Sequence, residues 1–182
     1  MKSQIVRMLQ VLILSSGLFC AVPVQAQEEK SSIAALLIDL EGWKAEAAEN
    51  QSVDLDGMTM TMVTRAYKQG GRRLEVTLMA GNRVLIHGKV AETTDEGKFP
   101  AAAGAARERV ATLDGFQAYA AHDPENKLHD LVIVLAQTAQ DGALVTFFSE
   151  GVTEKEALEL AQKFDWKQMQ TVMEKLLAPK KG

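Results

Sequence analysis

The sequence predicts a single α+β domain in which one antiparallel β-sheet, of about five to seven strands, is covered by N- and C-terminal helices. Apolar and polar residues alternate through most segments between residues 58 and 149, which is the period of a β-strand. Short turns, several containing glycine, separate these segments, so neighbouring strands should pair antiparallel. Helical spacing of apolar residues is clear only near the two ends of the domain.

The N-terminal residues Met1–Ala26 have the composition of a secretory signal peptide. Lys2 and Arg7 give a positive start, Leu9–Phe19 is an apolar core, and small residues precede the expected cleavage after about Ala26. The apolar core is shorter than the ~20 residues that a spanning helix needs. We therefore expect a single exported domain, residues 27–182, without an integral membrane span after cleavage.

Cysteine content and charge restrict the environment and the partners. Cys20 is the only cysteine and leaves with the signal peptide, so the mature chain would contain no disulfide, thiol nucleophile or thiolate metal site. This combination is typical of the Gram-negative periplasm. Loss of Lys2 and Arg7 changes the formal charge from −4 to −6. Nucleic acid is thereby excluded as an expected partner, since phosphate binding needs concentrated positive charge.

The first half of the domain predicts a helix followed by a β-hairpin. Apolar residues at helical spacing over Ile33–Leu40, after a serine that can cap, predict a helix that ends at Gly42. Alternation then predicts a strand over Met58–Lys68. The pair Gly70-Gly71 is a hairpin turn, and Leu74–Ala80 is the returning strand.

The middle of the chain is ambiguous, whereas the second half is regular. Val84–Val90 fits either a helix or a strand, and Thr93–Gly104 is interpreted as a surface loop. Four strands follow: Arg107–Leu113, Phe116–Ala121, Leu128–Gln137 and Ala143–Ser149.

Two amphipathic helices are predicted at the C-terminal end. Thr153 and Glu156 form a capping-box pattern before the first, and Trp166–Leu177 forms the second. Together they carry more apolar residues than one helix face needs. The C-terminal helices could therefore bind a protein partner or a second copy, although packing in the core is the alternative.

Part of the second half resembles a known fold type. The residues are Gly115-Phe116-Gln117-Ala118, the hairpin Leu128–Glu150 and the helix junction Phe164-Asp165-Trp166-Lys167. This arrangement resembles that of uncharacterised small periplasmic α+β proteins, and it is similar to the Mog1/PsbP-like α/β/α sandwich. The resemblance rests on packing residues, so it implies a fold and no active site.

Alternating methionines are the most unusual local feature. On a strand, Met58, Met60 and Met62 point to one face. Thioether sulfurs select Cu(I), which makes these three residues the candidate metal ligands. The alternatives are adaptable core packing or a surface for a small hydrophobic ligand.

The remaining candidates for chemistry are few. His122-Asp123 and His129-Asp130 each place an imidazole beside a carboxylate, so they could bind zinc or line an enzyme cleft, or they could be solvated loop residues. Basic residues on the first hairpin, such as Arg65 and Arg72, fit an anion patch or a guarded strand edge. No catalytic set with known spacing occurs.

The sequence therefore predicts an exported, non-catalytic binding or envelope-accessory protein without a resident cofactor. Two alternatives stay open. The first is a carrier of Cu(I) or of a small hydrophobic ligand that uses the face of Met58, Met60 and Met62. The second is an enzyme with a cleft around His122 and His129.

Overall fold

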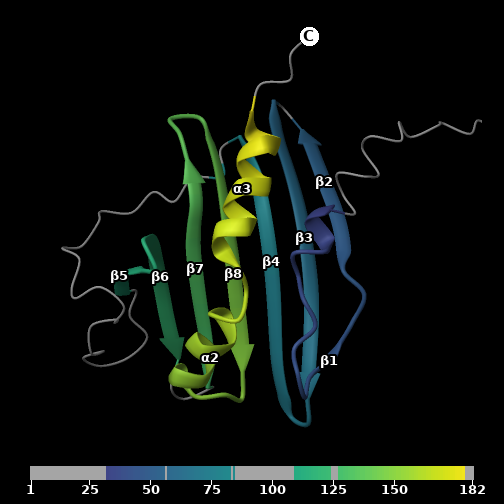
Figure 1. The fold of residues 1–182 in the computed structure, drawn as a ribbon, viewed down its shortest axis with the longest axis vertical. Coiled ribbons are helices and arrows are strands. Elements are labelled where there is room, and N and C mark those ends of the chain that lie inside the picture. The colour runs from purple at the N-terminus through teal and green to yellow at the C-terminus, as the bar shows by residue number, and fades with distance from the viewer. Residues whose placement is uncertain (1–31, 56, 83, 85–108, 124–126, 179–182) are drawn as a thin grey trace, which may run out of the picture.

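The computed structural model describes residues 32–55, 57–82, 84, 109–123 and 127–178 (Figure 1). The predicted signal peptide, nearly all of Val84–Val90 and the predicted loop Thr93–Gly104 lie outside these residues. The strands are β1 (Lys44–Ala45), β2 (Glu49–Leu55), β3 (Met58–Gln69), β4 (Arg72–Asn82), β5 (Arg109–Leu113), β6 (Phe116–Asp123), β7 (Leu128–Gln137) and β8 (Asp141–Glu150). The helices are α2 (Glu154–Ala161) and α3 (Trp166–Leu177), and residues 32–34 are also helical.

All the strands of the described residues belong to one antiparallel sheet, as predicted, but this sheet has eight strands rather than five to seven. The order is β1-β3-β4-β8-β7-β6-β5. The strand β2 pairs with β3 as well, along residues 58–64, next to the part of β3 that pairs with β1. The two strands that the sequence did not predict are β1 and β2. The sequence of β2, Glu49–Leu55, is mostly polar because it lies at the edge of the sheet, and so it lacks a regular apolar alternation.

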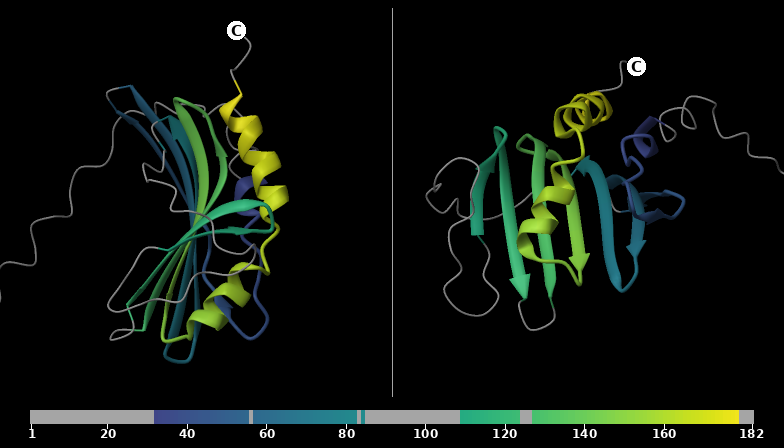
Figure 2. Two further views of the ribbon diagram at one scale, coloured as in Figure 1. Left: turned by 90° about the vertical axis from the view of Figure 1, so that its left-hand side faces the viewer. Right: turned by 60° about the horizontal axis from the view of Figure 1, so that its bottom comes forward.

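The two faces of the sheet have different surroundings. The face that carries Val63, Leu78 and Ile133 is called the first face. The face that carries Met62, Met79 and Leu144 is called the second face. Within the described part of the chain, the helices lie on the first face, as the side view in Figure 2 shows. They cover only part of it, because α3 packs on β4, β7 and β8, and α2 packs on β7 and β8.

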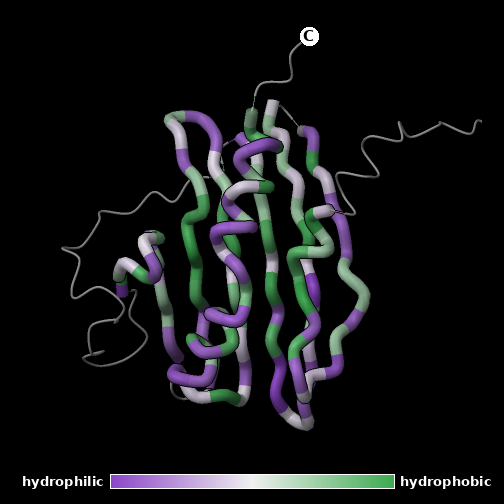
Figure 3. Tube along the Cα trace, in the orientation of Figure 1, coloured by the Kyte–Doolittle hydropathy of each residue, from purple (hydrophilic) through white to green (hydrophobic). Residues whose placement is uncertain are grey.

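The core is the layer between the first face and the helices. Phe164, at the junction of α2 and α3, packs on Phe147 of β8 with ring centroids 5.3 Å apart and meets Tyr67 of β3 edge-on at 6.2 Å. From α3, Met169 and Met173 are fully buried against the sheet. Figure 3 shows the hydrophobic residues running along the central strands β4, β7 and β8. Burial of this apolar layer provides most of the stability.

The N-terminal segment differs from the predicted helix. In the described part of this segment, which begins at residue 32, helix is present only at residues 32–34, although Ile33, Leu36, Leu37 and Leu40 are all buried in the core. Side chains of β3 bind the carbonyl groups that a continuing helix would use. The Arg65 guanidinium donates to the Leu37 carbonyl oxygen, and the Tyr67 hydroxyl donates to that of Ile38 at 2.9 Å. Burial raises the pKa of Tyr67 to about 12.

Both C-terminal helices are confirmed. The Thr153 side chain accepts a hydrogen bond from the Glu156 backbone N–H, and the Glu156 carboxylate accepts one from the Thr153 N–H. This capping box satisfies two N–H groups that a helix start leaves without partners. At α3, the Asp165 carboxylate caps by accepting from the Gln168 N–H at 2.9 Å.

We expect the two faces to differ in their contribution to stability. Ile133 is fully buried on the first face, so Ile133→Ala should lower the free energy of unfolding by about 2–5 kcal/mol. Its neighbour Val132 is half-buried on the second face, and Val132→Ala should cost only roughly 1 kcal/mol. Urea denaturation of both variants measures the difference. Equal losses would contradict the assignment of the core to the first face.

Candidate functional site

The three predicted methionine ligands lie on β3, on the second face of the sheet. Their neighbour Val63 points to the core and is fully buried, whereas Met58, Met60 and Met62 are half-buried. The strand pairing separates them into two groups. Met60 and Met62 have neighbours on both β2 and β4, but Met58 has a pairing partner only on β2, namely Leu55.

A fourth methionine joins this group from β4. Met79 is the direct cross-strand partner of Met62 and lies on the same face. Direct partners have Cβ atoms about 4.5–5.5 Å apart, and the diagonal neighbour Met60 is within reach of a long side chain. We call Met60, Met62 and Met79 the thioether cluster. The register could have been found from the sequence, because a two-residue turn at Gly70-Gly71 pairs Gln69 with Arg72 and hence Met62 with Met79.

A glycine lies beside the thioether cluster because the backbone of β3 leaves no room there for a side chain. Gly81 is the cross-strand partner of Met60 and the next residue after Met79 on that face. A Cβ atom there would lie 2.1 Å from the Thr59 carbonyl oxygen and 2.7 Å from the Met60 Cα atom. Since no larger residue fits, no other side chain of β4 separates Met60 from Met79.

The two predicted histidines lie side by side, but the carboxylates next to them in sequence point to the opposite face of the sheet. His122 of β6 and His129 of β7 are cross-strand partners on the first face. Because side chains alternate along a strand, Asp123 and Asp130 point to the second face. Among the described residues, no group of three or more histidine, cysteine or carboxylate side chains is placed to hold a metal ion. The two His-Asp pairs therefore do not assemble into the zinc site considered from the sequence.

The imidazole rings of His122 and His129 are stacked. Their centroids are 4.2 Å apart and their planes differ by 8°. His122 Nδ1 lies 3.2 Å from the Leu128 carbonyl oxygen, and His129 Nε2 lies 3.0 Å from that of Val152. Since a carbonyl only accepts, each of these nitrogens carries the proton. The lone pairs of the other two ring nitrogens, His122 Nε2 and His129 Nδ1, lie in nearly parallel planes and do not converge on one ion.

Other buried polar groups surround His129. Ser149 of β8 is its cross-strand partner and is 1% exposed. Neither Ser149 Oγ nor His129 Nδ1 has a hydrogen-bond partner among the described residues. Arg109 of β5 is also buried, and its Nη2 lies 2.5 Å from Glu154 Oε1 at the start of α2. We call His122, His129, Ser149, Arg109 and Glu154 the histidine cluster.

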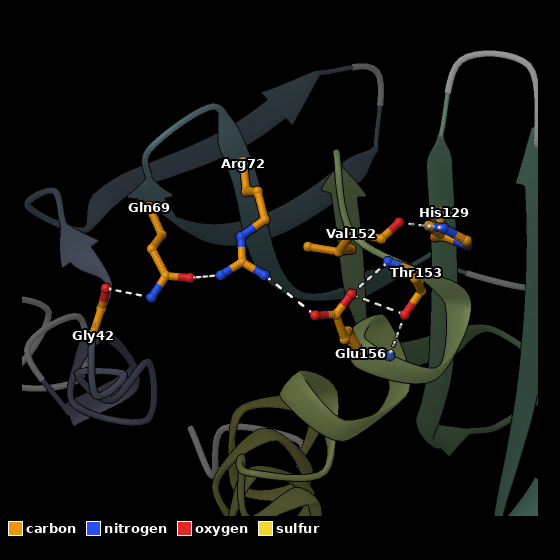
Figure 4. A network of polar contacts seen from close by, with 7 residues as sticks. All are labelled: Gly42, Gln69, Arg72, His129, Val152, Thr153 and Glu156. Carbon is orange, nitrogen blue, oxygen red and sulfur yellow. Dashed lines mark hydrogen bonds and ion pairs between the residues drawn. The ribbon is translucent and has the colours of Figure 1, made fainter.

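A second polar network lies beside the histidine cluster (Figure 4). The Gln69 side-chain amide donates to the Gly42 carbonyl oxygen at 2.8 Å, and Arg72 donates to the Gln69 side chain. Arg72 also pairs with Glu156 at 3.3 Å, and its guanidinium lies over the Trp43 ring. The network thus connects the N-terminal segment, the first hairpin and α2. With Arg65 bound to the N-terminal segment, two of the basic residues of this hairpin have structural roles, which weighs against an anion patch.

Burial shifts the pKa of His129 and hydrogen bonds shift that of Glu156, both at this end of the sheet. Burial lowers the pKa of His129, and the nearby His122 and Arg109 act in the same direction, whereas Glu154 and the Val152 carbonyl oppose them. Hydrogen bonds from the Thr153 backbone and side chain lower the pKa of Glu156. The lowered pKa favours the neutral imidazole of His129, and the ring is buried beside the Val152 carbonyl, which favours a structural role over an open cleft.

Most of the apolar side chains of the C-terminal helices are used within the domain. Leu160, Phe164, Met169 and Met173 are buried, and Leu158, Val172, Leu176 and Leu177 pack on the core while partly exposed. Association through these helices stays a prediction. None of the helices in the described ranges is long and apolar enough to cross a membrane.

Comparison of the chain with models of known protein families, with curated proteins and with solved structures gives no match. The resemblance to the Mog1/PsbP-like sandwich therefore stays a prediction.

The unpartnered hydroxyl of Ser149 leads to a test of the histidine cluster. A buried hydroxyl without a hydrogen bond costs free energy, so Ser149→Ala should leave the stability within about 0.5 kcal/mol of wild type or raise it. Chemical denaturation at pH 7.5 measures this effect. A loss above about 1.5 kcal/mol would mean that the hydroxyl has a hydrogen-bond partner in solution.

Proposed function

We propose that the protein is an exported, non-catalytic carrier of Cu(I), which it binds through the thioether cluster Met60, Met62 and Met79. The observation that carries the proposal is the pairing of Met62 with Met79 on the second face, with Met60 beside them. The proposed ligand set replaces the sequence-based set by one residue, since Met79 takes the place of Met58.

The chemistry of the three side chains favours a soft monovalent ion. Thioethers are uncharged and polarisable, so they bind Cu(I) and discriminate against hard cations such as Mg²⁺ and Ca²⁺, which require oxygen ligands. Methionine has three rotatable side-chain bonds, so three of them on adjacent strand positions can turn their sulfur atoms to one point. The half-buried positions leave a path for an ion to enter.

The expected compartment supports the same proposal. Export through the signal peptide at residues 1–26 would leave a chain without cysteine. In an oxidising compartment thiolates are lost to disulfides, whereas a thioether site needs no free thiol. The formal charge of −6 after cleavage also favours the approach of a cation.

The placement of the histidines weighs against an enzyme. His129 is 5% exposed and hydrogen-bonded to the Val152 carbonyl oxygen, and Ser149 beside it is completely covered. A general base or a nucleophile must reach a substrate, and these positions are enclosed between the sheet and α2.

We expect the purified protein to bind one Cu(I) per chain. Anaerobic titration with ascorbate present, in competition with bicinchoninate, measures the affinity. Removal of all three thioethers in Met60→Leu/Met62→Leu/Met79→Leu should weaken binding by more than the ~10–100-fold that the loss of an outer-shell partner costs. Methionine and leucine have similar volumes, so the fold should persist with a loss of stability below about 1.5 kcal/mol per site.

Met58→Leu is the matched control, because Met58 lies on the same strand and face but beyond the pairing with β4. Its affinity should stay close to that of wild type. Two results would contradict the proposal: no Cu(I) binding by the wild type, or unchanged binding by the triple variant. Loss of binding in Met58→Leu as well as in the triple variant would return the ligand set to the one predicted from the sequence.

A further inference from the structure

The histidine cluster lies where α2 is attached to the sheet, apart from the thioether cluster on the other face. Two of the polar contacts in this attachment come from the histidine cluster; the Arg72–Glu156 pair and the hydrogen bond from the Gly151 N–H to the Lys127 carbonyl oxygen are others. His129 Nε2 of β7 donates to the carbonyl oxygen of Val152, the residue before the α2 N-cap, and Arg109 of β5 pairs with Glu154 in the first turn of α2. Both contacts come from buried side chains on the first face. A change of charge at His129 therefore alters the contacts that hold the start of this helix on the sheet.

From this geometry we infer that the stacked pair His122–His129 is an acid-sensitive latch, in which uptake of a proton releases Val152 and the start of α2 from the sheet. The released state is a local opening in which the loop Gly151–Thr153 and the first turns of α2 leave β7 and β8. The rest of the core, including α3, stays packed.

The groups that face His129 explain why the closed state resists the proton. A new proton would go to Nδ1, which is buried and has no acceptor bonded to it among the described residues. The charged ring would lie 4.2 Å from the parallel ring of His122 and near the Arg109 guanidinium. Glu154 and the Val152 carbonyl act in the opposite direction, and Ser149 of β8 is neutral. Desolvation is the largest effect, and the closed state therefore favours neutral His129.

The sign of the pH dependence follows from proton counting. His129 has a lowered pKa in the closed state, whereas in the open state it is solvated and titrates near its usual value of about 6.5. Between those two values the open state holds more protons than the closed state. Acidification below about pH 6.5 therefore favours opening, by up to about tenfold per pH unit for one proton. Above that pH the latch stays closed and the equilibrium no longer depends on this group.

Hydrogen–deuterium exchange of the purified protein between pH 5 and pH 7.5 tests the latch, after correction for the intrinsic exchange rates. Peptides that cover residues 150–161 should show a higher opening equilibrium at pH 5 than at pH 7.5, by at most about 30-fold for one proton. Peptides that cover α3, residues 166–177, are the internal control and should change much less. The variant His129→Gln keeps a donor for Val152 but cannot titrate, so opening of residues 150–161 should become independent of pH.

Two results would overturn the inference: opening of residues 150–161 that does not respond to pH in the wild type, or a response that persists in His129→Gln. A parallel rise in α3 would mean global unfolding and would also overturn it. If His129→Gln does not fold, an NMR titration of the wild-type histidines decides. His129 should then titrate below the pKa of a free imidazole, and the amide shifts of α2 should follow the same curve. Titration at the free value, or α2 shifts that do not follow it, would reject the latch.

Discussion

The packing of Phe164 between the helices and the sheet is the contact on which the rest of the structure depends. Its ring lies on Phe147 of the central strand β8 and meets Tyr67 of β3 edge-on. Because Phe164 joins α2 to α3, this one side chain fixes where both helices lie on the first face. Tyr67 continues the same layer to the N-terminal segment through its hydrogen bond to the Ile38 carbonyl oxygen. Three parts of the chain that are distant in sequence are thus held in one hydrophobic layer.

Because the helices of the described residues lie only on the first face, the two faces of the sheet differ in their chemistry. Side chains that share a face with Phe147 are enclosed where the helices cover them, so a polar group there must be neutral or paired, as with His129 and the Arg109–Glu154 pair. Several side chains on the other face keep partial exposure, and the thioether cluster is among them. Strand parity therefore separates a buried polar cluster from the half-buried methionines that we propose as soft ligands. The two proposals concern opposite faces and can be tested independently.

Several elements followed directly from local patterns. The helix Trp166–Leu177, the capping box at Thr153 and the hairpin around Gly70-Gly71 depend on contacts within a few residues, and the structure has all three. The strands β1 and β2 were not predicted, because they are held by pairing with β3 and carry polar sequences. The N-terminal helix was predicted too long. Its apolar spacing is real, but Arg65 and Tyr67 bind the carbonyl groups of residues 37 and 38 from a distant strand.

The sequence by itself determined the fold class, most of the strands and the common face of Met58, Met60 and Met62, since strand period and turn chemistry are local properties. Only the tertiary structure decided which face the helices cover, because both faces carry apolar residues and the choice depends on how α2 and α3 return to the sheet. That choice placed His122 and His129 under α2, turned Asp123 and Asp130 to the other side and left the methionines half-buried. Pairing between distant segments is a property of the whole chain, and the residues of one strand do not determine which helix packs on them.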